Sequence, residues 1–192
     1  MIKIIPPQQF NKTPWKNGKG ETTELAINDG GTLESFDWRM SMAKVTENGA
    51  FSYFSGYLRN LILIDGNGMH LQHDQSRIDK LDKLLSFATF DGGCHTVATL
   101  PAGPIVDINI ITKADKYHVS VETFINQQDV TLRASTHCFI FCLDADSRLF
   151  SADKSTDIIL KYQHLMLLSP AESEVLQVNG KNMIVVHLDE IV

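Results

Sequence analysis

The sequence predicts a mainly β fold, either one large sandwich or barrel or two smaller ones in tandem. Few segments of the 192 residues repeat apolar side chains with the 3.6-residue period of an α-helix. Many segments of four to eight residues instead alternate apolar and polar side chains, or run apolar, and Gly, Asn and Asp separate them. A dozen short strands with one or two short helices are typical of a sandwich or barrel.

Each expected strand is a run rich in β-branched, aromatic or other apolar residues. In chain order, the expected strands are residues 22–27, 38–45, 61–64, 69–72, 96–100, 105–112, 117–124, 137–143, 158–162, 164–168, 174–177 and 183–188. The turns at 65–68 (DGNG) and 179–180 (NG) predict β-hairpins, because Gly and Asn tolerate the positive φ of tight turns. Only residues 76–85 carry apolar side chains at helical spacing, which predicts a short helix there.

The charge and the apolar runs exclude several classes of protein. The net charge is −6 and there is no basic stripe, whereas nucleic-acid-binding proteins neutralise phosphates with clustered Lys and Arg. The apolar run at the amino terminus ends at Pro6 and is too short for a signal peptide, and no later run approaches the ~20 apolar residues of a membrane span. We therefore expect a cytoplasmic protein with neither nucleic acid nor a membrane as partner.

The cysteines fit a reducing compartment, because Cys94, Cys138 and Cys142 are an odd number without a paired framework. Cys138 and Cys142 lie four apart in one expected strand, so they face the same side but are too far apart for a disulfide. Core packing is therefore favoured over a redox pair.

Three expected strands combine a polar face with an apolar one. Residues two apart on a strand point the same way and lie about 6.6 Å apart. The faces that hold the polar groups are, strand by strand, Thr22, Glu24 and Ala26; Arg39, Ser41 and Ala43; and Ile105, Asp107, Asn109 and Ile111. Such faces either contact water or line a pocket. Charged groups beside isoleucines favour a pocket, where charges persist only when they are paired or hydrogen-bonded.

In such a pocket, Arg39 offers a planar fork of donors that matches a carboxylate of a ligand. Either Glu24 or Asp107 would fix this fork from behind. Asn109 and Ser41 would then hydrogen-bond a second polar group of the ligand. These five residues form the centre of the predicted binding site.

The stretch 14–26 is expected to form one wall of the same pocket. We expect Trp15, Asn17 and Thr22 to contact the ligand and the Gly-Lys-Gly loop to supply backbone donors. Arg59 is a candidate second carboxylate clamp, although a surface ion pair is the commoner state of a lone Arg. The aromatic residues within 51–57 are expected to form core or a lid, with ligand stacking as the alternative.

Four blocks of the sequence resemble the HutD/Ves family and occur in the family's order. They are residues 15–24 (WKNGKGETTE), 38–43 (WRMSMA), 49–59 (GAFSYFSGYLR) and 103–109 (GPIVDIN). The resemblance covers roughly residues 14–112, and beyond it only length and β character agree. Lys16 and Lys19 stand where the family more often has Arg and Gly, and residues 108–111 (INII) replace a more usual Phe-Asn-Leu/Ile-Met.

The resemblance implies a bicupin, with two cupin-type β-barrels at residues 1–112 and 113–192. It also implies a link to histidine utilisation, where HutD-type proteins are thought to limit pathway activity by binding a formylated glutamate intermediate. Ves-type members are associated with stress or cold, and no firm enzymatic activity attaches to the family. Cupins often bind a metal through His-x-His, which is absent here, and His70 and His73 would face opposite sides of a strand. We therefore expect no metal and no cofactor.

The leading hypothesis is a metal-free protein that binds a small acidic metabolite such as N-formylglutamate and modulates histidine utilisation or a stress response. A homodimer is one arrangement open to it. A second hypothesis is a metal-independent isomerase or hydrolase that uses Glu24 or Asp107 as general base. A third is a stress-related interaction protein that tolerates the loss of Arg39.

Overall fold

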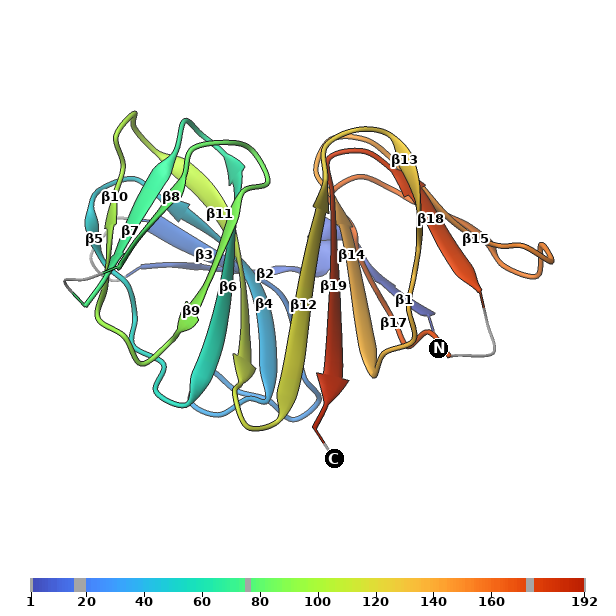
Figure 1. The fold of residues 1–192 in the computed structure, drawn as a ribbon, viewed down its shortest axis with the longest axis horizontal. Helices are drawn as coiled ribbons and strands as arrows, with labels where there is room; N and C mark the ends of the chain where they lie inside the picture. Colours follow the sequence, from blue (N-terminus) through green and yellow to red (C-terminus); the bar gives the residue numbers. More distant parts are fainter. Residues whose placement is uncertain (1, 16–19, 75–76, 172–174, 192) are drawn as a thin grey trace. The chain divides into compact units, whose positions relative to one another are not determined.

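The computed structural model describes residues 2–15, 20–74, 77–171 and 175–191, and these residues form almost only β-strands (Figure 1). The one helix among them is a short 3₁₀ turn, η1 (Pro7–Gln9). No helix in the described part is long and apolar enough to cross a membrane. The predicted mainly β fold is confirmed.

The strands divide the chain into two compact units. The first unit is Phe10–Lys116, and the second unit combines Met1–Gln9 with Tyr117–Val192. The boundary therefore lies at 116/117 rather than at the expected 112/113, and the first nine residues belong to the second unit. The cause is β1 (Ile2–Ile5), which pairs antiparallel with β17 (Leu165–Leu168) along its whole length.

The first unit contains two sheets. Its larger sheet has the strand order β2 (Asn11–Pro14), β3 (Gly20–Ile27), β4 (Trp38–Val45), β11 (Ile105–Lys113), β6 (Tyr57–Asp65) and β9 (Phe87–Asp91). Its smaller sheet has the order β5 (Gly49–Ala50), β10 (Thr96–Thr99), β7 (Met69–His73) and β8 (Arg77–Leu81). All pairings within both sheets are antiparallel.

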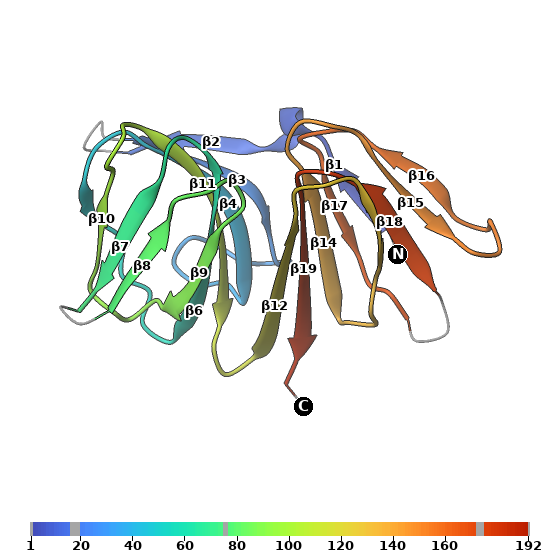
Figure 2. The same ribbon diagram turned by 45° about the horizontal axis from the view of Figure 1, so that its top comes forward.

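The second unit repeats this topology. Its larger sheet has the order β1, β17, β14 (His137–Cys142), β19 (Met183–Glu190) and β12 (Tyr117–Phe124). Its smaller sheet has the order β13 (Gln128–Thr131), β18 (Leu176–Gly180), β15 (Ser147–Ser151) and β16 (Asp157–Leu160). The eight strands β12 to β19 can be matched in chain order with β4 to β11, so that β12 corresponds to β4 and β19 to β11 (Figure 2). The order β4-β11-β6-β9 of the first unit then recurs as β12-β19-β14-β17 in the larger sheet of the second. In the smaller sheets, β5-β10-β7-β8 recurs as β13-β18-β15-β16. Closure of either unit into a barrel stays a prediction.

The expected helix at 76–85 is wrong, because this segment contains β8 followed by a turn. β8 pairs with β7, and Leu81 lies opposite Met69. Leu81 and Leu85 are buried and Ile78 is exposed, and Leu85 reaches the core from a turn in which its φ is 64°. The helical spacing of these apolar residues therefore arises from a strand and a turn. Pairing with β7 outweighs the local propensity.

The two expected hairpins are also wrong. The turn at 65–68 joins β6 to β7, and the connection after 179–180 joins β18 to β19. In each case the two strands lie in different sheets, so the chain crosses from one sheet to the other. Gly66 and Gly68 take φ values of 95° and 114°, which glycine adopts without steric cost. The same turn residues thus serve a sheet-to-sheet crossing as well as a hairpin.

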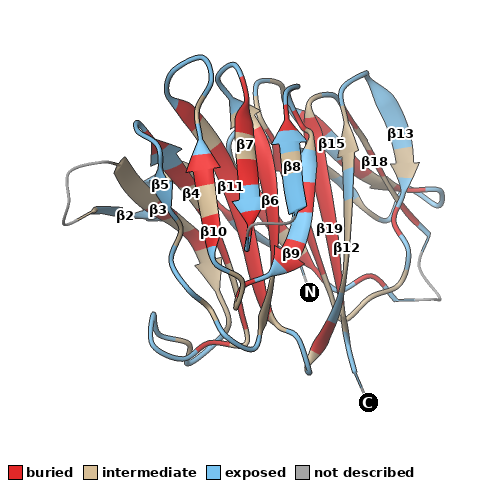
Figure 3. Ribbon diagram, turned by 60° about the vertical axis from the view of Figure 1, so that its left-hand side comes forward, coloured by how far each residue is buried: buried red, intermediate tan, exposed pale blue. Residues whose placement is uncertain are grey.

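Each unit has an apolar core of its own. Buried residues concentrate on β4, β6 and β11 of the first unit, whereas β8 is largely exposed and β9 exposes alternate residues (Figure 3). In the second unit, Cys138 and Cys142 are fully buried in the core as free thiols, so their expected core packing is confirmed. Burial raises the pKa of the Cys142 thiol to about 11, so it packs as a small protonated side chain.

Candidate functional site

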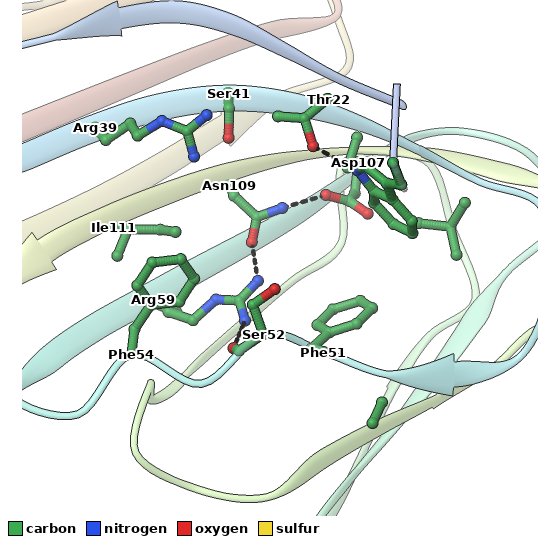
Figure 4. A pocket seen from close by; sticks show the side chains of 14 residues that line it. Thr22, Arg39, Ser41, Phe51, Ser52, Phe54, Arg59, Asp107, Asn109 and Ile111 are labelled. Atoms are coloured by element: carbon green, nitrogen blue, oxygen red, sulfur yellow. Dashed lines mark hydrogen bonds between the residues drawn. The ribbon is translucent and has the colours of Figure 1, made fainter. Parts of the chain in front are cut away.

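A cavity of about 360 Å³ lies in the first unit among β3, β4, β6, β11 and the segment that follows β5 (Figure 4). Its walls are formed by Trp15, Thr22, Arg39, Ser41, Ala43, Val45, Ala50, Phe51, Ser52, Phe54, Arg59, Asp107, Asn109 and Ile111. A volume of this size suits a small metabolite. Of the predicted ligand-binding residues in the described part of the chain, all except Glu24 line this cavity.

The strand register brings the polar faces of β3, β4 and β11 together. Asn109 lies opposite Ser41 of β4, and Asp107 lies opposite Ala43. Thr22 of β3 also pairs with Ala43. Residues directly opposite one another in an antiparallel pair project to the same side of the sheet. These residues therefore share the face that lines the cavity, and the expected convergence of the three strands is confirmed.

A β-bulge in β3 changes one detail of that face. The register with β4 shifts between Glu24 and Ala26, so Glu24 lies opposite Ser41 and Ala26 lies opposite Met40. An extra residue reverses the alternation beyond it. Ala26 therefore does not share the face of Thr22 and Glu24, and the expectation for Ala26 is wrong.

Arg39 is held by Glu24, as one of the two expected arrangements has it. Arg39 Nε donates to Glu24 Oε2 over 2.7 Å. The side chains are 11% and 22% exposed, so the wall of the cavity shields this ion pair from much of the solvent. The ion pair uses Nε, which leaves the Nη groups of the same fork to donate to a ligand. The fork lies beside Ser41 (Figure 4).

Arg59 and Asp107 are linked through Asn109. Arg59 Nη2 donates to Asn109 Oδ1 over 2.5 Å, and Asn109 Nδ2 donates to Asp107 Oδ1 over 2.5 Å (Figure 4). Arg59 Nη1 also donates to the backbone oxygen of Ser52 over 3.2 Å. The amide of Asn109 thus stands between the guanidinium and the carboxylate. Asp107 therefore contacts Asn109 and not Arg39. Of the two carboxylates expected to fix the Arg39 fork, it is Glu24 that does so.

Arg59 is buried rather than in a surface ion pair. It is 5% exposed, and its Cζ lies 5.1, 5.6 and 5.2 Å from the ring centroids of Phe51, Phe54 and Phe90. Rings at this range stabilise a cation through their quadrupoles. Burial lowers the pKa of Arg59 to about 10, with Asp107 opposing the shift, so the guanidinium stays charged at neutral pH. The three rings come from β9 and from the segment after β5. They surround the guanidinium in place of the water that hydrates an Arg at the surface.

Asp107 is the most strongly perturbed carboxyl of the cavity. Its side chain is fully buried, and this desolvation raises its pKa to about 7 although the charge of Arg59 opposes the shift. Within the described residues, Asp107 Oδ2 and Arg59 Nε are buried without a hydrogen-bond partner. Buried polar atoms are rarely left in this state. The hydrogen bonding of Asp107 and Arg59 is therefore incomplete within the described residues.

Trp15 closes one side of the cavity. Its Nε1 donates to Thr22 Oγ1 over 2.8 Å, and its backbone N–H donates to the oxygen of Gly20 over 2.9 Å. A Cβ at Gly20 would overlap the backbone oxygen of Lys44 and press on the Trp15 ring, so this position requires glycine. Asn17, a predicted contact, lies outside the described residues, as does most of the loop that contains it.

Sequence reasoning does not identify Ser52 as a wall residue and assigns Phe51 and Phe54 to core or a lid. The structure places all three on the cavity wall. Tyr57 is partly buried away from the cavity wall, and its hydroxyl donates to the backbone oxygen of Phe36 over 2.8 Å. The signal that points to this part of the wall is the aromatic run directly before Arg59, since aromatic rings readily enclose a guanidinium.

In the second unit, a buried histidine and a half-exposed arginine each contact a neighbouring polar side chain. His187 is 1% exposed, contacts Ser135 Oγ over 2.9 Å and lies 4.0 Å from Cys138 Sγ. Burial lowers the pKa of His187 to about 4, so it is neutral at physiological pH. Arg133 pairs with Asp189 over 2.6 Å. These groups complete small clusters beside the apolar core.

Possible metal ligands do not gather in the part of the chain that the structure describes. No group there brings together three or more His, Cys, Asp or Glu side chains in a way that could hold a metal ion. His70 contacts Asp82 and His73 contacts Asp79, each over 3.1 Å. His73 is buried and His70 is partly exposed, as the alternation of β7 requires.

Comparison with known sequences identifies the family. A sequence profile of the HutD family matches residues 7–186. An uncharacterised 21.2 kDa protein in the 3′ region of hutC in Pseudomonas putida is 30% identical over 180 residues, which are 94% of either chain. Protein Ves of Citrobacter koseri is 35% identical over 108 residues, which are 56% of either chain.

Solved structures agree with this match. HutD from Pseudomonas fluorescens SBW25, determined in a formate condition, has a TM-score of 0.84 and 25% identity, with both chains covered completely. The bacterial pirin YhhW of Escherichia coli, in complex with nickel(II), has a TM-score of 0.70 at 6% identity, a likeness of fold alone. The family resemblance of the first half is confirmed and extends over nearly the whole sequence. The chain belongs to the HutD family.

Proposed function

We propose that the cavity of the first unit binds a small carboxylate metabolite and leaves it chemically unchanged. The observation that carries this proposal is the presence of two arginines in one cavity. Arg39 is oriented by Glu24, and Arg59 is buried. An entering carboxylate would exchange water for charge-assisted hydrogen bonds with Arg39. In a cavity shielded from water such bonds are stronger than at the surface.

N-formylglutamate carries the groups that this site would recognise. A carboxylate of the ligand would meet Arg39, and the formamide offers one acceptor and one donor to Ser41 and Asn109. The Asn109 amide has a second N–H, because only one is needed for its bond to Asp107. By binding this ligand the protein would respond to the level of a catabolic intermediate and modulate histidine utilisation. The match to protein Ves supports a stress response as a second setting for the same binding.

Isothermal titration calorimetry with N-formyl-L-glutamate and glutarate tests this proposal. We expect Arg39→Ala to weaken binding about ten- to hundredfold, because a charge-assisted hydrogen bond contributes about 1.5–3 kcal/mol. Arg148→Ala is the matched control. Arg148 also pairs with a carboxylate through Nε over 2.7 Å, but it lies in the second unit and is 55% exposed, so its loss should leave the affinity unchanged. Equal affinities of wild type and Arg39→Ala would reject the role of Arg39.

NMR spectra of the protein–ligand mixtures from the calorimetry show whether the protein only binds the ligand or also converts it. Asp107 is the group that an enzyme would use here, since a carboxyl with a pKa of about 7 suits general acid–base chemistry. Proton NMR spectra of each ligand after prolonged incubation with the protein should stay unchanged. Product formation that ceases in Asp107→Asn would replace the binding function by a metal-independent isomerase or hydrolase.

A further inference from the structure

Asp107 is the cavity group whose charge is least compensated by direct contacts. Its side chain is fully buried, and Oδ1 accepts a hydrogen bond from the neutral amide of Asn109. Oδ2 has no hydrogen-bond partner among the described residues. A buried carboxylate with a single neutral donor is costly in its ionised form. The protonation state of Asp107 therefore depends on which charges share the cavity.

The other charged groups of the described cavity wall come from β4 and β6. β4 contributes Arg39, which is paired with Glu24 of β3. β6 contributes Arg59, whose fork is separated from Asp107 by the Asn109 amide. The described wall residues before β3, in β5 and after β5 bring aromatic rings, an alanine and a serine but no titratable group. With Asp107 ionised, the two arginines of the described wall, Asp107 and the Glu24 that is paired with Arg39 sum to zero charge.

We propose that this cavity binds a carboxylate with Asp107 in its protonated form, so that binding above neutral pH takes up a proton on Asp107, an inference that rests on the proposed function. An anion entering a cavity of zero net charge leaves one negative charge uncompensated and away from water. A proton from solvent on Asp107 offsets one unit of this negative charge and removes the repulsion between Asp107 and the carboxylate of the ligand. It also leaves the charge of Arg59 to the ligand. Occupancy of the site then depends on pH as well as on the concentration of the metabolite.

The size of the effect follows from how the free protein titrates. Burial raises the pKa of Asp107 to about 7, so its proton is exchanged near neutral pH. The protonated fraction falls from about 0.9 at pH 6 to about 0.1 at pH 8, and the fraction in the binding-competent state sets the apparent affinity. Ligand binding should therefore weaken about tenfold between these two pH values.

Calorimetry with glutarate tests this coupling. Glutarate is a suitable probe because its carboxyl groups titrate below pH 6 and are largely ionised from pH 6 to 8. We expect wild type to bind glutarate about tenfold more weakly at pH 8 than at pH 6. At pH 8, titrations in two buffers of different ionisation enthalpy should show uptake of nearly one proton.

Two variants assign the proton. Asp107→Asn has the shape of the neutral carboxyl without its titration, so both the pH dependence and the proton uptake should vanish. Asp157→Asn neutralises an exposed carboxylate in the second unit and should retain both. A pH dependence that persists in Asp107→Asn would assign the proton to another group and overturn the inference.

The wild-type result separates this inference from the function on which it rests. Glutarate binding that is independent of pH, or tighter at pH 8, overturns the inference and leaves the proposed function standing. Asp107 would then keep the same protonation state in the free and in the bound protein. If wild type binds neither glutarate nor N-formyl-L-glutamate at either pH, the proposed function fails together with the inference.

Discussion

Replacing Asp107 by asparagine is expected to stabilise the ligand-free protein at neutral and alkaline pH. The pKa of the wild-type carboxyl is about 7 in the folded state, above its ordinary value of 3.8. Between these values the folded protein holds a proton that the unfolded chain has released. As the pH rises, the contribution of Asp107 to the free energy of unfolding therefore falls by about 1.4 kcal/mol per pH unit, and it levels off above pH 7. From pH 5 to pH 8 the wild type should lose about 3 kcal/mol that Asp107→Asn keeps.

Urea unfolding followed by tryptophan fluorescence at pH 5 and pH 8 measures this effect. The difference between variant and wild type is compared at the two pH values, because the subtraction cancels the other titrating groups. Asp157→Asn is the control without a pH effect in this range. The hydrogen bond with Arg148 lowers the pKa of Asp157 below its ordinary value of 3.8, so this carboxylate is ionised at both pH values in the folded and in the unfolded chain. The stability difference between Asp157→Asn and wild type should therefore be the same at pH 5 and pH 8. Parallel pH profiles for wild type and Asp107→Asn would show that Asp107 is ionised in the folded protein throughout.

Replacing Arg59 by alanine is expected to cost both stability and ligand binding. The change empties the space among three phenylalanine rings and leaves Asn109 Oδ1 and the Ser52 backbone oxygen without their donor. A cavity in packed surroundings and a buried unpaired acceptor together cost about 3 kcal/mol or more. We also expect affinity for N-formyl-L-glutamate to fall more than about hundredfold, because the cavity loses one of its two cations and the support of Asn109.

Urea unfolding and calorimetry on Arg59→Ala, Arg59→Lys and Arg148→Ala test this expectation. Lysine keeps the charge but has no planar fork for Asn109 and Ser52, so it should restore only part of the stability. Arg148 also lies over a ring, at 5.6 Å from the centroid of Phe150, but it is exposed, so its loss should cost less than about 1 kcal/mol. If Arg59→Ala were as stable as Arg148→Ala, the buried contacts of Arg59 would contribute nothing.

The polar faces of the cavity could be predicted from the sequence because alternation along a strand fixes which side chains share a side. Arg39, Ser41, Asp107 and Asn109 share their face for this reason, and the antiparallel register then brings β4 and β11 together. The exception is Ala26, where a bulge reverses the alternation of β3. The alternation of side chains therefore predicts which residues share a face only where the strand has no bulge.

The burial of Arg59 could not be predicted in the same way. It depends on Phe90 of β9, a strand whose five residues expose alternate side chains and give a weak pattern. The place of β1 in the second unit likewise depends on a pairing with β17 across most of the chain. Neither contact has a local signature, because long-range pairing is decided by which sheet edge is open rather than by the segment itself.

The most direct test of carboxylate binding in this cavity is an NMR titration of the arginine side chains. N-formyl-L-glutamate is added to ¹⁵N-labelled protein while the Nε–Hε signals are followed, and the Arg39 signal reports on a proton already donated to Glu24. We expect the signals of Arg39 and Arg59 to shift and saturate together, while that of Arg148 stays in place. Unchanged signals of Arg39 and Arg59 at millimolar ligand, or an equal shift of Arg148, would contradict binding in the cavity.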